Sequence, residues 1–260
     1  MSNLLTTKKS PLKDKPLRYA GQSIDEEINR IIDEDAAPYI SASLTLILFA
    51  VFEWYRWYAH IPPSPWIFTI MALLFTGYSA YKMLNIKSQL KNLKQGRDGE
   101  KIVGQSLENL RNHGTKILHD IRGNNFNIDH VVVSTKGIYL IETKTYSKPI
   151  KGKTEILFDG EQLLFNGVSY GDDIIIQVKA EKKWLTDLIE ELTARKYPVQ
   201  PILVFPGWFV RMHNAFSSGI SALNPDNLPV FLNNKQEIMT LEDVKLVSNH
   251  LSRYIRSLDK

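Results

Sequence analysis

The sequence predicts an α/β protein in which a mixed β-sheet packs between helices and follows a hairpin of two apolar helices. Two uncharged apolar stretches come early in the chain, at 39–52 and 66–80. From about residue 92, short strand-forming runs alternate with amphipathic helices, which is typical of a sheet covered by helices. We therefore expect three regions, namely a mostly disordered segment at 1–38, the helical hairpin at 39–84 and a folded domain at 92–260.

The composition limits the classes of protein to consider. The chain has 260 residues, of which 43% are apolar and 23% charged, as is ordinary for a folded protein. Its net charge of +4 permits a polyanionic partner without requiring one. The sequence contains no cysteine, so disulfides and thiolate metal sites are excluded.

The apolar hairpin has the length and flanking residues of a membrane anchor. The expected helices at 39–58 and 66–84 are close to the roughly 20 residues that cross the hydrocarbon core of a bilayer. Glu53 and Arg56 are three residues apart, so they can pair on one helix face near the end of the first span. Aromatic residues gather at the proline-rich turn, as in an interfacial belt: Trp54, Tyr55, Trp57, Tyr58 and Trp66.

Basic residues flank the hairpin on the sides away from its turn. They precede the first span from Lys8 to Arg18 and follow the second from Lys82 to Arg97. The positive-inside bias then predicts a multi-pass protein of the inner or plasma membrane with both termini in the cytoplasm. The alternative is a buried helical hairpin in a soluble protein. Within the N-terminal segment, residues 24–32 predict one short amphipathic helix.

The folded domain is expected to begin with a helix at 93–112, which places Glu100 at the edge of the inward-facing stripe. A helix at 177–196 is expected to face inward through Ala180, Trp184, Leu188 and Leu192. The other expected elements are strands at 116–118, 131–133, 138–141, 155–158, 162–165, 201–205 and 229–232, and a helix at 240–258. Asp159-Gly160 marks the turn of one hairpin, and Thr240 with Asp243 forms a capping box.

One β-hairpin, around the turn Ser-Thr-Lys-Gly, carries most of the chemical information. If Val133 pairs with Ile138, the antiparallel register places Asp129 directly opposite Glu142 on the same face. Lys144 points to that face as well, because strand side chains repeat with period two. Two acids beside an ammonium group suit a hard divalent cation with a phosphate nearby.

The same residues have an ordinary interpretation. Asp129 can accept hydrogen bonds from a turn or strand, and Glu142 with Lys144 can form a same-face ion pair of little energetic weight. The nearby histidines are expected to take no part in chemistry, with His130 packing on the opposite face and His113 and His119 at the surface.

The motifs resemble the nuclease-related domain (NERD), a branch of the PD-(D/E)XK nuclease-like superfamily, over about residues 96–210. The matching segments are Gly99-Glu100, Ile128-Asp129-His130, Gly137 through Tyr146, Ile150-Lys151-Gly152 and Gln177. The chain departs from the family where Ile174-Ile175-Ile176 replaces an Asn-Pro pair before the glutamine. A tryptophan usual after the second hairpin is also missing. The resemblance implies a restriction-endonuclease-like mixed sheet flanked by helices and metal-dependent hydrolysis of nucleic acid.

The resemblance also implies a role for each acidic residue. Asp129 and Glu142 hold Mg²⁺, with Mn²⁺ as an alternative, and the backbone carbonyl of Thr143 is a further ligand. Mg²⁺ suits this set because it prefers carboxylate and water oxygens and keeps positions open for substrate. Glu100 orients water or binds a second ion.

The remaining implied roles belong to Lys144, which positions or polarises the attacking water, and to Gln177, which supports Lys144 or the substrate. Five further lysines are expected to contact nucleic-acid phosphates: Lys148, Lys151, Lys179, Lys182 and Lys183. Such contacts make binding steeply dependent on salt. A solvated helix face explains the lysines after Gln177 equally well.

Two functional hypotheses remain from the sequence. The first is a membrane-anchored, metal-dependent nuclease that acts on the cytoplasmic side, on DNA in preference to RNA. The second is a catalytically inactive module on the same fold, tethered to the membrane, that binds nucleic acid or protein. The complete set of Asp129, Glu142 and Lys144 favours the first hypothesis, whereas the missing Asn-Pro pair favours the second.

Overall fold

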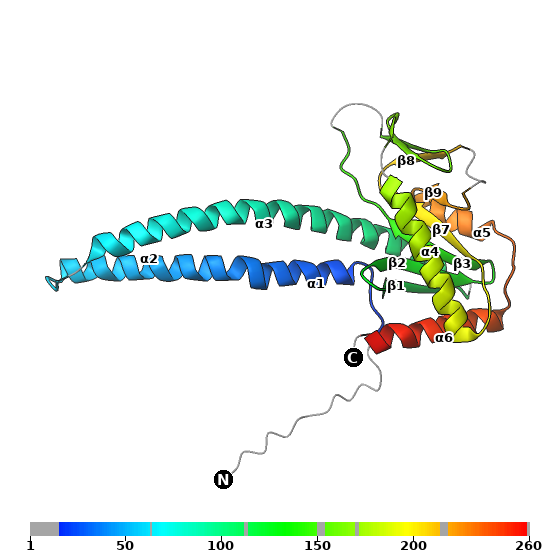
Figure 1. Cartoon of the computed structure of the whole chain (residues 1–260), viewed down its shortest axis with the longest axis horizontal. Coiled ribbons are helices and arrows are strands. Elements are labelled where there is room, and N and C mark those ends of the chain that lie inside the picture. The colour runs from blue at the N-terminus through cyan, green and yellow to red at the C-terminus, as the bar shows by residue number, and fades with distance from the viewer. Residues whose placement is uncertain are drawn as a thin grey trace, which may run out of the picture. The chain divides into compact units, whose positions relative to one another are not determined.

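The computed structural model describes residues 16–62, 64–111, 114–149, 154–169, 172–213 and 218–258 (Figure 1). The chain divides into two compact units. The hairpin unit is Gly21–Asp98, and the sheet unit comprises Met1–Ala20 and Gly99–Lys260.

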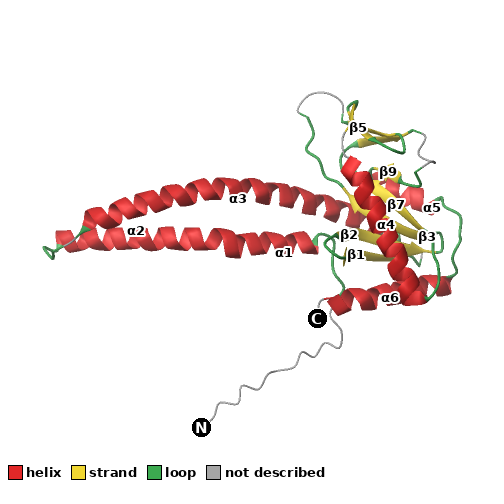
Figure 2. Cartoon of the chain, viewed as in Figure 1, coloured by secondary structure: helices red, strands yellow, loops and turns green. Residues whose placement is uncertain are grey.

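The hairpin unit is helical in nearly all of its described residues (Figure 2). It contains α1 (Gln22–Arg30), the π-helical segment η1 (Ile31–Ala36), α2 (Ala37–Tyr58) and the larger part of α3 (Pro65–Glu108). The predicted amphipathic helix is confirmed as α1, but the helix continues to Tyr58, so residues 22–38 are not disordered. The predicted break between 84 and 93 is also wrong, because residues 82–95 contain no glycine or proline to end α3.

Polar and aromatic contacts lie within and between the two long helices of the hairpin unit. The Ser43 hydroxyl donates to the Ser79 hydroxyl at 2.9 Å. The predicted pair is confirmed, since Arg56 Nη1 donates to Glu53 Oε1 at 2.8 Å. The Trp54 ring lies against two other tryptophan rings at the turn, with centroids 5.8 and 5.7 Å away. Both helices are long and apolar enough to cross a membrane, and most of their apolar side chains are exposed.

The sheet unit is built around a mixed five-stranded sheet, which confirms the predicted fold class. Its strand order is β1-β2-β3-β7-β9. The strands are β1 (Lys116–Arg122), β2 (Asn127–Ser134), β3 (Gly137–Thr143), β7 (Val199–Val204) and β9 (Ser221–Leu223). The first three strands pair antiparallel, whereas β7 and β9 run parallel to β3.

A second, smaller sheet has the order β6-β5-β4-β8. Its strands are β4 (Glu155–Phe158), β5 (Leu163–Phe165), β6 (Val168–Ser169) and β8 (Phe209–Met212). The predicted hairpin around Asp159-Gly160 is confirmed by the pairing of β4 with β5. The Asp159 carboxylate accepts the backbone N–H of Gln162 at 2.7 Å, which closes this turn. The sequence did not predict β8 or β9.

Helices cover both faces of the five-stranded sheet (Figure 1). On one face, α4 (Asp172–Thr193) and α6 (Leu241–Leu258) pack on the aliphatic side chains of β2 and β3. On the other face lie the C-terminal turns of α3 and the short helix α5 (Leu228–Asn233). The C-terminal end of β3 lies beside the first turns of α4, where Gln177 hydrogen-bonds to Glu142.

Two helix starts show how capping decides the local structure. The capping box of α6 is confirmed, because Thr240 Oγ1 accepts the Asp243 N–H at 3.1 Å and Asp243 Oδ2 accepts the Thr240 N–H at 3.2 Å. The strand predicted at 229–232 is wrong, since these residues form α5. The Asn224 side chain accepts the Asn227 N–H at 2.9 Å and begins a 3₁₀ turn that leads into this helix.

Candidate functional site

The register of β2 and β3 brings the two predicted acids together. Val133 pairs with Ile138, as the sequence predicts. Continued toward the open end of the hairpin, this register sets Asp129 opposite Glu142. There the Thr143 backbone N–H donates to Asp129 Oδ2 at 2.7 Å. Asp129, Glu142 and the Thr143 peptide therefore lie together at one end of the sheet.

Both acids are held where a negative charge is costly. Burial raises the pKa of Asp129 well above its usual value, and the charges of Glu142 and Glu100 raise it further. Burial likewise raises the pKa of Glu142, which is only 3% exposed. Within the described chain, the buried Oε2 of Glu142 accepts no hydrogen bond. A cation beside this oxygen offsets the cost of two neighbouring charges.

Lys144 and Gln177 complete a closed set of hydrogen bonds with Glu142. Lys144 Nζ donates to Glu142 Oε1 at 2.8 Å and to Gln177 Oε1 at 3.0 Å. Gln177 Nε2 donates to the same Glu142 oxygen at 3.1 Å. Burial alone lowers the pKa of Lys144, but the charge and hydrogen bond of Glu142 outweigh burial and raise that pKa above its usual value. The lysine is therefore an ammonium group near neutral pH.

The helix that carries Gln177 begins earlier than the sequence predicts. It starts at Asp172, so Gln177 lies inside α4 rather than opening it. The residues before Gln177 are part of this helix, and two of them, Ile174 and Ile175, are buried in the core between α4 and the smaller sheet. The segment that departs from the Asn-Pro pattern thus continues the helix into the hydrophobic core.

Glu100 reaches the site because α3 passes very close to the segment after β3. A Cβ atom at Gly99 would lie 1.9 Å from the Thr145 hydroxyl oxygen, so only glycine fits at this crossing. The next residue on the helix, Glu100, is close enough to Asp129 for its charge to raise that pKa. In the Gly-Glu pair predicted from the sequence, Gly99 therefore allows the close approach of α3 to Thr145, and Glu100 places a carboxylate near Asp129.

The donor set fits one small, hard cation with incomplete protein ligation. Among the described residues, no group of three or more His, Asp or Glu side chains is arranged to hold a metal ion. Asp129 and Glu142 instead supply two carboxylates, and the Glu142 Oε2 lacks a partner within the described residues. Mg²⁺ is commonly held by one or two carboxylates and keeps several waters. The residues therefore fit Mg²⁺ or the similar Mn²⁺.

The predicted phosphate-binding lysines are spread over two segments. Lys148 is exposed after β3, and α4 carries exposed Lys179 and half-buried Lys182. Lys183 is exposed but forms an ion pair with Asp187 at 2.5 Å on the same helix. Lys151 lies outside the described residues. The structure thus leaves three of the five side chains exposed and one partly so.

One histidine prediction is wrong. His119 is not a surface residue, because its side chain is only 11% exposed and its Nδ1 lies 2.9 Å from the Nδ1 of His130. Burial lowers the pKa of both imidazoles, so the pair is neutral at physiological pH. His130 is fully buried on the face away from Asp129, as predicted. His113 lies outside the described residues.

The sequence reasoning missed Glu181, which is 1% exposed on α4. Its Oε1 accepts a hydrogen bond from Gln177 Nε2 at 2.7 Å. Burial, with the charge of Glu142, raises the pKa of Glu181 to about 8. The spacing of four residues from Gln177 was the available signal, because residues i and i+4 share a helix face. The inward stripe was instead assigned through Ala180, which is exposed.

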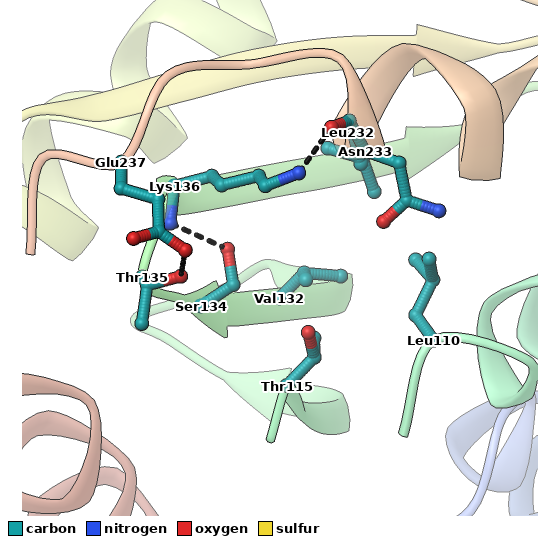
Figure 3. A pocket seen from close by; sticks show the side chains of 9 residues that line it. All are labelled: Leu110, Thr115, Val132, Ser134, Thr135, Lys136, Leu232, Asn233 and Glu237. Carbon is teal, nitrogen blue, oxygen red and sulfur yellow. Dashed lines mark hydrogen bonds between the residues drawn. The ribbon is translucent and has the colours of Figure 1, made fainter. Parts of the chain in front are cut away.

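A separate hollow of about 330 Å³ lies at the turn between β2 and β3 (Figure 3). Ser134, Thr135 and Lys136 line it from the turn, and Lys136 Nζ donates to the backbone carbonyl of Asn233. This turn is at the opposite end of both strands from Asp129. None of the predicted site residues lines the hollow.

Comparison with known proteins agrees with the motifs. Residues 95–206 match the family described as nuclease-related domain, NERD. No curated protein matches the sequence. The structure of Pyrococcus furiosus SfsA in complex with Ca²⁺ is similar at 16% identity and a TM-score of 0.24, covering 50% of this chain and 55% of that chain. The chain thus spans about half of SfsA, and a TM-score this low does not establish a shared fold.

The matched range contains the two acids of β2 and β3, the lysine that follows them and the glutamine of α4. Residues 95–206 of this chain therefore resemble a nuclease-related domain in sequence and carry its motif residues at one end of the sheet.

Proposed function

We propose that this chain is a membrane-anchored, metal-dependent nuclease that hydrolyses phosphodiester bonds of DNA, with RNA as an alternative substrate, on the cytoplasmic side. The nuclease-related domain supplies the class of activity. The observation that carries the proposal is the meeting of Asp129, Glu142 and Lys144 at one end of the sheet, with Glu142 buried and Asp129 half-buried beside an ammonium group.

The proposed metal site uses two neighbouring carboxylates whose ionised forms are unfavourable without a cation beside them. Asp129 and Glu142 would hold Mg²⁺ or Mn²⁺, Glu142 through its Oε2, with the Thr143 carbonyl as a further ligand. The bound ion supplies Lewis acidity at a phosphoryl oxygen and lowers the pKa of a water molecule. Glu100 orients water or helps to hold a second ion, because its charge already acts on Asp129.

Lys144 acts as a hydrogen-bond donor in this scheme. Its raised pKa keeps it protonated, so it is not the group that accepts a proton from the attacking water. It orients this water and stabilises the negative charge that develops on the phosphoryl oxygens. Gln177 holds the ammonium group through its Oε1. The phosphates on either side of the scissile bond meet the lysines at 148, 151, 179, 182 and 183.

The proposed anchor is the hairpin at 39–84, which contacts the lipid bilayer. Its apolar side chains are mostly exposed, whereas a helical hairpin inside a soluble protein buries them. The tryptophan cluster at the turn supports an interfacial position for that turn. Basic residues on the other side support cytoplasmic termini and a cytoplasmic domain.

The alternative is a catalytically inactive module that binds nucleic acid or protein beside the membrane. Two observations favour it. Lys144 already neutralises one oxygen of Glu142. No set of three or more acidic or histidine side chains is arranged around a metal position in the described chain. A module of this kind keeps the fold and the exposed lysines without cleaving its ligand.

Cleavage by the full-length chain in detergent micelles tests the proposal. Labelled single-stranded DNA, double-stranded DNA and RNA are incubated with the protein in Mg²⁺, Mn²⁺ or EDTA. We expect metal-dependent cleavage that is lost in Glu142→Ala and Lys144→Ala. Matched changes at exposed positions of α6, Glu242→Ala and Lys245→Ala, keep it. Binding without cleavage under every metal condition supports the inactive module instead.

A further inference from the structure

We propose that Glu181 is a positioning residue of this site, which fixes the side-chain amide of Gln177 and through it the ammonium group of Lys144. The inference rests on the proposed nuclease and extends it by one residue. Glu181 contacts neither of the proposed metal ligands through a hydrogen bond in the described chain, so it acts through Gln177.

The hydrogen bonds of Gln177 allow one orientation of its amide. A carboxamide offers two N–H donors and one carbonyl oxygen. Here Nε2 donates to Glu142 Oε1 at 3.1 Å and to Glu181 Oε1 at 2.7 Å, while Oε1 accepts Lys144 Nζ at 3.0 Å. A flipped amide would turn its oxygen toward two carboxyl groups and its donors toward an ammonium group. The shortest of these contacts is the one to Glu181.

The fold itself does not require an acid at this position. Glu181 is 1% exposed, and its neighbours on the same face of α4, Val178 and Leu185, are fully buried apolar residues. Its Oε2 is buried and accepts no hydrogen bond within the described residues. A buried carboxyl group with one oxygen unsatisfied destabilises a protein, whereas a leucine of similar size suits such a position. What the glutamate adds is the hydrogen bond to Gln177.

Loss of this hydrogen bond has a specific consequence for Lys144. One N–H of Gln177 then lacks a partner, so the amide rotates more freely about its last torsion. Lys144 is held between Gln177 Oε1 and Glu142 Oε1, and without the first acceptor it moves toward the second. Displacing a donor that acts on the transition state lowers kcat more than it changes KM. A loss of about 10–100-fold is typical for residues that orient a catalytic group.

Two substitutions in the full-length protein separate positioning from structure. Glu181→Leu removes the acceptor, and we expect kcat for DNA cleavage to fall by about 10–100-fold with KM unchanged. Glu181→Gln keeps a carbonyl oxygen that accepts the Gln177 N–H, so we expect it to retain most of kcat. Both variants should melt no lower than the wild type, and the matched Glu191→Leu on the exposed side of α4 should behave as wild type. Full activity in Glu181→Leu, or a loss that follows a lower melting temperature, overturns the inference.

A second readout does not depend on cleavage. In protein labelled with ¹⁵N-glutamine, with Gln177→Ala to assign the signal, hydrogen exchange of the Gln177 side-chain amide is measured. We expect slow exchange in the wild type and in Glu181→Gln, and fast exchange in Glu181→Leu. If this pattern holds while the wild type cleaves nothing, the proposed nuclease fails and the positioning role stands. If the wild type cleaves but its Gln177 amide exchanges as fast as that of Glu181→Leu, the positioning role fails and the nuclease stands.

Discussion

Replacing Glu181 with glutamine should stabilise the metal-free protein in neutral and alkaline solution. Burial, with the charge of Glu142, raises the pKa of Glu181 from 4.5 to about 8. Between these values the folded protein binds more protons than the unfolded chain, so the free energy of unfolding falls as the pH rises through this window. Glutamine does not titrate in this range, so the variant lacks the part of the decrease in unfolding free energy that comes from ionising Glu181.

The size of the effect follows from the rise in pKa. Each pKa unit corresponds to about 1.36 kcal/mol, so a rise of about 3.5 units gives an upper limit of about 5 kcal/mol above pH 8. Neighbouring groups relax around an ionised carboxylate, and replacing buried charged groups typically stabilises a protein by about 1–4 kcal/mol. We therefore expect Glu181→Gln to be more stable by about 1–4 kcal/mol at pH 9 and by much less at pH 5.

Urea unfolding of the full-length protein in detergent and EDTA measures this difference. Unfolding is followed at pH 5, 7 and 9 by the fluorescence of the tryptophans in the sheet unit, Trp184 and Trp208, in a background variant whose three hairpin tryptophans are replaced by phenylalanine. Glu191→Gln, at an exposed position of the same helix, is the control and should follow the wild type. Equal loss of stability with pH in the wild type and Glu181→Gln would refute the reasoning, because Glu181 would then not retain its proton.

Three further predictions concern the cation, an ion pair and a close crossing. Mg²⁺ should raise the melting temperature of the wild type but not of Glu142→Ala, as a thermal scan with and without EDTA would show; an equal rise in both would place the cation elsewhere. Arg18 and Asp120 form an ion pair at 2.7 Å with both side chains under 5% exposed, so Arg18→Ala alone should cost about 3–5 kcal/mol of unfolding free energy. The double variant should cost less than the two single changes combined, and strict additivity in urea unfolding would contradict this. Gly99→Ala should destabilise the protein by about 1–3 kcal/mol, because the added Cβ would lie 1.9 Å from the Thr145 hydroxyl oxygen. Gly96→Ala is the control and should not destabilise it, because its nearest contact is 3.6 Å away. Equal melting temperatures of the two variants would show that α3 has room for a Cβ at this crossing.

The part of the site that could be predicted depends on local pattern. Alternating strand residues and a turn between them set the register of β2 and β3, and this register alone places Asp129 beside Glu142 and points Lys144 to the same face. Period-two geometry needs no knowledge of the rest of the fold. The capping box of α6 was predictable for the same reason, because Thr240 and Asp243 interact within a single helical turn.

The part that could not be predicted depends on tertiary packing. Trp184, Leu188 and Leu192 of the predicted stripe on α4 pack on the core, but packing also buries the adjacent Leu185 and Ile189. On this wider face Glu181 is buried, whereas Ala180 is exposed. The ion pair of Arg18 joins residues on either side of the apolar hairpin, and no local pattern links it to Asp120. The segment 229–232 is apolar and short, so its pattern fits a strand as well as a helix, and the 3₁₀ turn that Asn224 begins leads the chain into the helix.

The sheet unit is interrupted in sequence by the hairpin unit, since Met1–Ala20 belongs with Gly99–Lys260. Arg18 is therefore synthesised before α2 and α3, and its ion pair with Asp120 on β1 can form only after both helices have been made. The chain therefore crosses between the two units twice, and a protease releases the whole sheet unit from the hairpin unit only by cutting at both crossings, near residues 20–21 and near residues 98–99.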